Sequence, residues 1–140
     1  ISSKKIMHSL THNPILGHIT TFGGNPVSCA ASLATLNVIL EENLLDGVHE
    51  KEALFHEYLQ HEKIIEVRSK GLLVAVEFDS FEYVEKIIKN LLELGVLSDW
   101  FLFCDNSIRI APPLIITQEE IKIACNKILQ AIDMSYELPS

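Results

Sequence analysis

The chain has 140 residues and a formal net charge of −8 at pH 7, and hydrophobic residues make up 48% of it. This length is enough for one domain, or one domain with an arm, that buries a core. The lysines and arginines are scattered and no apolar run approaches the length of a bilayer span, so we expect neither a nucleic-acid partner nor a membrane.

The first residues carry few signals of a fold of their own. The chain begins at Ile1 rather than at a methionine, which suggests a fragment or a processed product. Ile6, Met7 and Leu10 follow helical spacing, so we expect a short helix that ends before the Asn13-Pro14 pair.

Residues 17–26 predict a glycine-containing turn that opens a long helix. Asn25 is a suitable N-cap, and Pro26 suits the first helical position. Thr20 and Thr21 place two hydroxyls near amide donors at the positive end of that helix, which suits a phosphate. The lysine of a nucleotide P-loop is absent. On spacing alone, a Gly-Gly turn that feeds a capped helix is the simpler interpretation.

The helix expected at residues 26–43 is apolar on nearly every side. Its apolar positions form two stripes: Val27, Ala30, Ala31, Ala34 and Val38 in one, and Cys29, Leu33, Leu36 and Leu40 in the other. A helix that is apolar all round is usually buried all round. We therefore expect a missing domain or a partner subunit to cover one side. The alternative is a central helix of a self-sufficient domain.

The next elements change from helical to strand periodicity and back. Residues 48–59 have one apolar and one charged face, which predicts an amphipathic surface helix. Residues 64–78 have an apolar period of two, with 69–71 as the turn, which predicts a β-hairpin. Ser80 is a suitable N-cap for a helix that ends at Gly95.

The last third of the chain predicts a second hairpin and a final helix. Residues 96–104 are strand-like, 105–107 supply a turn, and 108–110 form the second strand. Thr117 and Glu120 match a capping box at the start of the final helix, whose tail after Met134 is expected to fray. The order α, α, β, β, α, β, β, α predicts an α+β fold: a small mixed or antiparallel sheet with helices packed on one face, preceded by a long helix.

Cysteines and histidines do not form a pattern of metal ligands. Cys29, Cys104 and Cys125 are widely spaced and include no C-x-x-C pair, so we expect buried, reduced thiols and a cytoplasmic protein. His8 and His12 stand at helical i, i+4 spacing, but no carboxylate is placed as a third ligand. We therefore expect no metal site.

Arg109 is the second candidate functional residue. It lies between Ile108 and Ile110, which are expected to face the core, so its guanidinium should emerge on the opposite face of the strand. The planar guanidinium matches a carboxylate bidentately, which lysine cannot do. On spacing alone, a solvated strand arginine is the simpler interpretation.

Three segments resemble the class III aminotransferases, the pyridoxal-phosphate family that includes acetylornithine, ornithine and 4-aminobutyrate aminotransferases. Residues 18–36 resemble the family segment H-x-x-T-F-G-G-N-P-x-x-C-A-A-A, and residues 107–121 resemble I-R-x-x-P-P-L-I-I-T-x-x-E. Residues 68–77 resemble the hairpin R-G-x-G-L-x-x-x-x-E, except that Ser69 stands where the family usually has glycine. The matches occur in family order across nearly the whole chain.

The resemblance implies roles for the candidate residues. Thr21, with Thr20 beside it, would reach the phosphate of pyridoxal 5′-phosphate bound to the neighbouring subunit of a homodimer. Arg109 would bind a substrate carboxylate or pair with a glutamate of the large domain. The Schiff-base lysine and the aspartate beside the ring nitrogen would come from that large domain, upstream of this chain. No residue here is assigned a catalytic role.

The resemblance thus implies the C-terminal part of a class III aminotransferase, with residues 1–25 as an arm and cofactor-phosphate turn, 26–43 as an interdomain helix and 44–140 as a small α+β domain. The intact enzyme would transfer an amino group between an amino acid or amine and a 2-oxo acid. Aminomutases and decarboxylases share these motifs.

The fragment alone is expected to be inactive. The alternative is a stand-alone small-molecule-binding or dimerisation module without catalysis, with Arg109 as a carboxylate anchor.

Overall fold

The computed structural model describes residues 2–11 and 20–136 of the chain. The chain divides into two units, residues 1–42 and 43–140. Some sequence predictions, namely those for His12, the Asn13-Pro14 pair and the first residues of the predicted turn, lie outside the described residues.

The described residues of the first unit form two helices, α1 (Lys4–His8) and α2 (Pro26–Glu41). Asn25 caps α2 as predicted, because its Oδ1 accepts from the backbone N–H of Val27 at 3.0 Å and of Ser28 at 3.2 Å. Pro26 takes the first helical position, where no N–H is needed. The sequence therefore determines locally where this helix starts.

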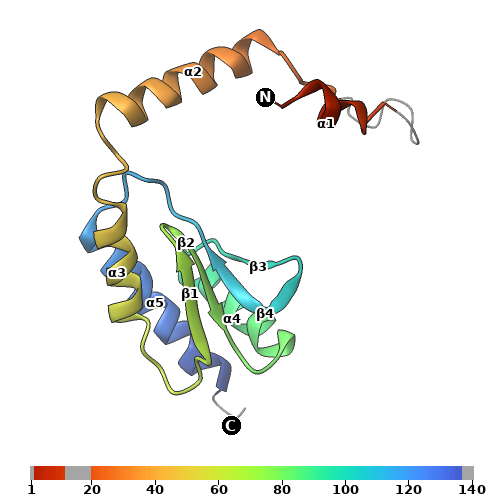
Figure 1. The fold of residues 1–140 in the computed structure, drawn as a ribbon. Helices are drawn as coiled ribbons and strands as arrows, with labels where there is room; N and C mark the ends of the chain where they lie inside the picture. Colours follow the sequence, from red (N-terminus) through yellow and green to blue (C-terminus); the bar gives the residue numbers. More distant parts are fainter. Residues whose placement is uncertain (1, 12–19, 137–140) are drawn as a thin grey trace. The chain divides into compact units, whose positions relative to one another are not determined.

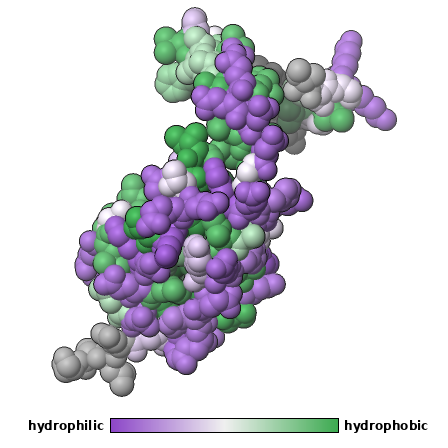
Figure 2. Space-filling view, turned by 90° about the vertical axis from the view of Figure 1, so that its left-hand side faces the viewer, coloured by the Kyte–Doolittle hydropathy of each residue, from purple (hydrophilic) through white to green (hydrophobic). Residues whose placement is uncertain are grey.

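None of the α2 side chains is buried within the described part of the chain. In Figure 2, hydrophobic residues are exposed at the surface around α2. We expected Cys29 to be buried, but it is exposed, because it lies on this helix. The large apolar side chains more than two-fifths exposed on this helix are Val27, Leu33, Leu36, Val38 and Leu40.

The second unit is built on a four-stranded sheet (Figure 1). Its strands are β1 (Glu66–Lys70), β2 (Leu73–Glu77), β3 (Asp99–Phe101) and β4 (Cys104–Ile110). They lie in the order β1-β2-β4-β3, and every neighbouring pair is antiparallel. β4 thus lies inside the sheet, between β2 and the edge strand β3.

Three helices cover one side of this sheet (Figure 1). They are α3 (Val48–Tyr58), α4 (Phe81–Glu93) and α5 (Gln118–Tyr136). Alternate strand residues point at them, because successive side chains of a strand face opposite ways. The fully buried side chains include Val74, Val76 and Ile108 of the sheet and Phe55, Ile87, Leu91, Ile121 and Ile132 of the helices. The predicted α+β fold, with helices on one face, is confirmed.

Both hairpin turns lie elsewhere than predicted. The first turn consists of Gly71 and Leu72, since Lys70 pairs with Leu73 and Gly71 has a φ of 59°. A two-residue loop with positive φ suits the twist of a hairpin, and glycine adopts that φ without strain. Residues 69 and 70 therefore belong to β1 rather than to the turn.

The second hairpin reverses at Leu102 and Phe103, and not at residues 105–107. The polar residues that suggested a turn have partners within the fold. Asn106 donates to the carbonyl of Phe78 at 3.1 Å, and Ser107 is fully buried. Turn propensity was therefore overridden by tertiary contacts.

The helix caps follow the sequence closely. The backbone N–H and hydroxyl of Thr117 each donate to Glu120 Oε2 at 2.8 Å, and Glu120 N–H donates to Thr117 Oγ1 at 3.2 Å. This is the predicted capping box. Gly95, with a φ of 78°, follows α4 as predicted. Ser80 is the N-cap of α4, but its side chain makes no capping hydrogen bond.

Candidate functional site

The turn that precedes α2 holds Thr20 and Thr21 at the surface. The carbonyl of Thr20 accepts from Gly23 N–H at 3.3 Å, and the carbonyl of Phe22 accepts from Asn25 N–H at 3.1 Å. A Cβ on Gly23 would collide with the hydroxyl of Thr20. Glycine at this position therefore lets the threonine hydroxyl lie close against the backbone.

The donors that the turn before α2 could offer to an anion are threonine hydroxyls rather than backbone N–H groups at the start of the helix. Asn25 already accepts from the amides of Val27 and Ser28, so these two donors of the α2 N-terminus are satisfied within the chain. Thr20 and Thr21 are both exposed, and no described residue is hydrogen-bonded to the Thr21 hydroxyl. A phosphate would therefore meet threonine hydroxyls here.

Arg109 projects from β4 on the side of the sheet away from the helices, as predicted. Its neighbours Ile108 and Ile110 pack into the core. Its guanidinium Nη2 lies 3.5 Å from Asp99 Oδ2, and both side chains are about half exposed, at 46% and 54%. The interior of the sheet thus fixes the backbone while the guanidinium remains accessible.

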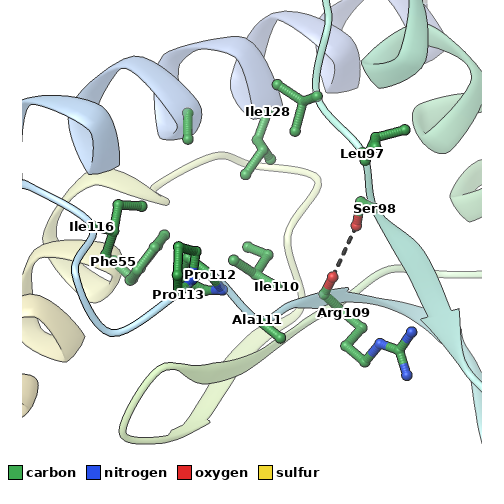
Figure 3. Close-up of a pocket in the computed structure, with 12 residues that line it drawn as sticks. Phe55, Leu97, Ser98, Arg109, Ile110, Ala111, Pro112, Pro113, Ile116 and Ile128 are labelled. Carbon is green, nitrogen blue, oxygen red and sulfur yellow. Dashed lines mark hydrogen bonds between the residues drawn. The ribbon is translucent and has the colours of Figure 1, made fainter. Parts of the chain in front are cut away.

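An apolar pocket of about 270 Å³ lies beneath the Arg109 backbone, between α5 and the Pro112-Pro113 segment. Figure 3 shows the guanidinium pointing away from this pocket. The polar link at its rim is the hydrogen bond from Ser98 Oγ to the carbonyl of Arg109, at 2.9 Å. The pocket therefore does not bring an anion to the arginine.

A second charged group lies on the same face of the sheet. Arg68 forms ion pairs with Glu77 and, at 2.7 Å, with Glu66. The hydrogen bond from Arg68 holds the pKa of the Glu77 carboxyl below its usual value, and Asn106 also donates to Glu77. The same pairing raises the pKa of Arg68. This arginine is neutralised by its neighbours, whereas Arg109 has a single carboxylate partner among the described residues.

Ser69 makes contacts that a glycine could not make. Its hydroxyl donates to Glu52 Oε1 at 2.6 Å and lies 2.7 Å from His56 Nε2. Glu52 also accepts from Gly71 N–H at 3.0 Å. The Ser69 hydrogen bond lowers the pKa of the Glu52 carboxyl. These contacts join α3 to the first hairpin.

Sequence reasoning missed Asp99. With a turn at residues 105–107, the residue opposite Arg109 would have been Phe103. The observed register pairs Asp99 with Arg109, with an irregularity between Trp100 and Phe101. The spacing of an aspartate and an arginine across a hairpin would have revealed the pair only if the turn had been placed correctly.

The candidate residues belong to separate units: the threonines to residues 1–42, and Arg109 to residues 43–140. In the described part of the chain, no group of three or more histidine, cysteine, aspartate or glutamate side chains could hold a metal ion. No described helix is long and apolar enough to cross a membrane.

Comparison with known proteins places the chain in a family. The sequence model of the family described as aminotransferase class-III matches residues 1–132. The chain is 40% identical over 121 residues to acetylornithine aminotransferase of Caldanaerobacter subterraneus subsp. tengcongensis. That alignment covers 83% of this chain but only 29% of the relative's length.

Solved structures of aminotransferases have the same fold over this region. Acetylornithine aminotransferase from Elizabethkingia anophelis matches with a TM-score of 0.72 and 30% identity, over 96% of this chain and 34% of that one. Ornithine aminotransferase from Toxoplasma gondii matches with a TM-score of 0.70 and 34% identity, over 93% of this chain and 31% of that one, and has partial occupancy of pyridoxal phosphate at its active site.

The match of residues 1–132 extends across both units and includes the threonine turn, the first hairpin and the Arg109 strand. Sequence relatives and solved structures agree with it. The chain therefore belongs to the class III aminotransferase family.

Proposed function

We propose that this chain is the C-terminal part of a pyridoxal-phosphate-dependent aminotransferase, which transfers an amino group between an amino acid or amine and a 2-oxo acid. The observation that carries the proposal is the family match over residues 1–132. Because the chain spans 29% of the length of its curated relative, the remaining machinery would lie in a large domain outside this chain.

The threonine turn fits one end of the cofactor. Thr20 and Thr21 are exposed residues, and each hydroxyl could donate one hydrogen bond to a phosphate oxygen. Gly23 and Gly24 place no side chains in the way of an approaching phosphate. Bound pyridoxal phosphate supplies an electron sink for the carbon that carries the amino group. This chain's share would be to hold the phosphate of the neighbouring subunit in a homodimer.

Arg109 would supply the contact with the substrate carboxylate. Its guanidinium is accessible on the open face of the sheet, and its present partner, Asp99, makes one contact at 3.5 Å rather than a bidentate pair. A substrate carboxylate could therefore take two hydrogen bonds from this arginine. Its role would be to bind and orient the substrate.

The domain roles follow from the same proposal. Residues 1–25 would be the arm with the phosphate turn, 26–43 an interdomain helix covered by the large domain and the second subunit, and 44–140 the small domain. The exposed apolar surface of α2 supports this division. All three cysteines are free, which supports the cytoplasm as the location.

The test uses the full-length protein loaded with pyridoxal phosphate. We expect amino transfer from an amino acid to 2-oxoglutarate. Arg109→Ala should raise the KM for the acid by about tenfold or more, because a charge-assisted bidentate contact is lost, with a smaller change in kcat. A full-length protein that binds the cofactor but transfers no amino group from any donor would refute the proposed activity.

Thr21 is tested by cofactor affinity. Thr21→Ala should weaken binding of pyridoxal phosphate, measured by its absorbance during titration, because one phosphate hydrogen bond is lost. Thr35→Ala is the matched control, since the Thr35 hydroxyl is on α2 and donates to the carbonyl of Ala31 within the helix. Equal affinities of the two variants would exclude the phosphate role.

One observation favours the alternative of a stand-alone binding or dimerisation module. Residues 43–140 bury a closed hydrophobic core of their own, drawn from three helices and the sheet. Such a module would bind carboxylates through Arg109 without catalysis. Calorimetric titration of residues 43–140 with glutarate would favour it if binding matched that of the full-length protein.

A further inference from the structure

Asp99 lies where it can control access to Arg109. The two residues are directly opposite each other in the antiparallel pair β3 and β4, and their carboxylate and guanidinium are 3.5 Å apart. An open hollow of about 270 Å³ is lined by both side chains together with Leu97, Ser98 and Ala111. A ligand bound to Arg109 in this hollow would therefore also meet Asp99.

The Asp99 carboxylate is held in place by its own strand. Its Oδ1 accepts from the backbone N–H of Trp100 at 2.8 Å, which leaves Oδ2 directed at Arg109. Ser98 Oγ donates to the carbonyl of Arg109 at 2.9 Å, so the two strands are joined beside the ion pair. Asp99 is thus a preorganised counter-ion.

The other surroundings of Arg109 leave room for a second carboxylate. On β2 the opposite residue is Ala75, whose methyl group makes no polar contact. The carboxylate of Glu77, on the same face, is paired with Arg68. Among the described residues, Asp99 is therefore the one acidic side chain within ion-pair distance of Arg109.

We propose that Asp99 determines specificity at this site, as the in-chain carboxylate that a substrate carboxylate must displace from Arg109. The inference rests on the proposed role of Arg109. Asp99 would disfavour carboxylate-bearing substrates, both by competing for the guanidinium and by repelling a second negative charge. Substrates without that carboxylate would leave the ion pair intact. The ratio of the two affinities would thus depend on this aspartate.

The expected effect is modest, because the pair is half exposed and joined by a single contact. Such pairs change an equilibrium constant by at most about fivefold. Asp99→Asn should therefore tighten binding of glutarate, an unreactive dicarboxylate, by about two- to fivefold in the full-length protein loaded with cofactor. The KM for 2-oxoglutarate should fall by a similar factor, and by more than the KM for a carboxylate-free amine, so that the ratio of the two KM values changes.

Two controls isolate the ion pair. Asp105→Asn removes the same charge from an exposed position on the same hairpin, with no contact to Arg109, and should leave glutarate binding unchanged. In the Arg109→Ala background, Asp99→Asn should give no gain, because the competition it relieves no longer exists. Asp99→Ser, as a second variant, should give the same gain as Asp99→Asn.

Each other outcome overturns the inference. These outcomes are unchanged or weaker glutarate binding in both Asp99 variants, an equal gain from Asp105→Asn, or an equal gain without Arg109. Because glutarate binding needs no turnover, the test is independent of the proposed activity. A protein that follows the expected binding pattern but transfers no amino group would refute the activity and leave the inference intact.

Discussion

Gly71 illustrates how one residue fixes the first hairpin. It has a φ of 59°, and a Cβ at this position would lie 3.0 Å from Val48 Cγ1 of α3. A side chain here would therefore meet both backbone strain and a close contact. Glycine allows the turn and the approach of α3 at the same position.

We predict that Gly71→Ala lowers the free energy of unfolding by more than Gly95→Ala does. Both glycines have positive φ, so each substitution should cost about 1–2 kcal/mol in backbone strain. Only Gly71 adds the contact with Val48, because a Cβ at Gly95 would have nothing nearer than Lys127 Nζ at 3.9 Å. Urea denaturation of the two variants checks this. Equal decreases in the free energy of unfolding would show that α3 moves to make room for the side chain at position 71.

The side-chain directions of the candidate residues could be predicted at this scale, but their partners could not. Alternation of apolar residues around Arg109 correctly placed its guanidinium on the open face. Its pairing with Asp99 depends on the strand register. The polar residues 105–107 predicted a turn about three residues too late, and therefore the wrong register. The departure at Ser69 was visible in the sequence, but its contacts with Glu52 and His56 come from α3, a separate element.

Among the elements, helix starts were predicted better than hairpin turns. Asn25 and the Thr117–Glu120 box act through residues two or three positions away, so sequence alone reveals them. The second hairpin depends instead on contacts between strands. Asn106 donates to the carbonyl of Phe78, which follows the neighbouring strand β2, so its preference for turns did not decide its place.

We predict that Thr117→Ala destabilises the protein by about 1 kcal/mol, the usual value of an N-cap side chain. Thr117 takes part in three hydrogen bonds with Glu120. Ser80→Ala is the matched control, because Ser80 occupies the N-cap of α4 without a side-chain capping bond. Thermal or urea unfolding should show a clear loss for the first variant and a smaller one for the second.

The hairpin β1–β2 should weaken in acid. The pKa of Glu77 is lowered in the folded state by its hydrogen bond from Arg68, so the folded protein favours the ionised form. Its contribution to stability is therefore present above the ordinary pKa of an unfolded glutamate and is lost as the pH falls through the lower folded value. The same sign holds for Glu52, whose carboxyl accepts from Ser69.

We accordingly predict that Glu77→Gln flattens the dependence of stability on pH below about pH 5. Glu57→Gln, an exposed substitution on α3, is the control for the loss of a carboxylate. Urea midpoints measured across this pH range check the prediction. A Glu77→Gln variant that loses stability in acid as steeply as the parent would contradict it.

At the scale of the whole molecule, the two units have opposite character. Residues 43–140 enclose a core, whereas α2 in the other unit exposes nearly all of its apolar side chains. An exposed apolar surface of this kind marks a place where other protein packs. The all-round apolar pattern of α2 predicted this surface from sequence. What packs on α2 could not be derived, because the pattern shows that its surface is apolar but not which residues cover it.

We predict that the isolated 140-residue chain self-associates, whereas residues 43–140 alone remain monomeric. The apolar helix α2 would drive the association, and the mainly hydrophilic face of the second unit in Figure 2 would not. Sedimentation velocity at several concentrations distinguishes the two. The substitution of Leu33 and Leu36 by glutamate should reverse the association, and a chain that still associates would point to another surface.

The three cysteines, placed at three depths, could act as chemical reporters of assembly. Cys29 is exposed on α2, Cys104 is half-buried, and Cys125 is fully buried, where burial raises the pKa of its thiol to about 12. A thiol-alkylating reagent should therefore modify Cys29 of the isolated chain first and Cys125 only after the second unit unfolds. Protection of Cys29 in the full-length protein would then report coverage of α2, and the labelling rate of Cys125 would report opening of the core.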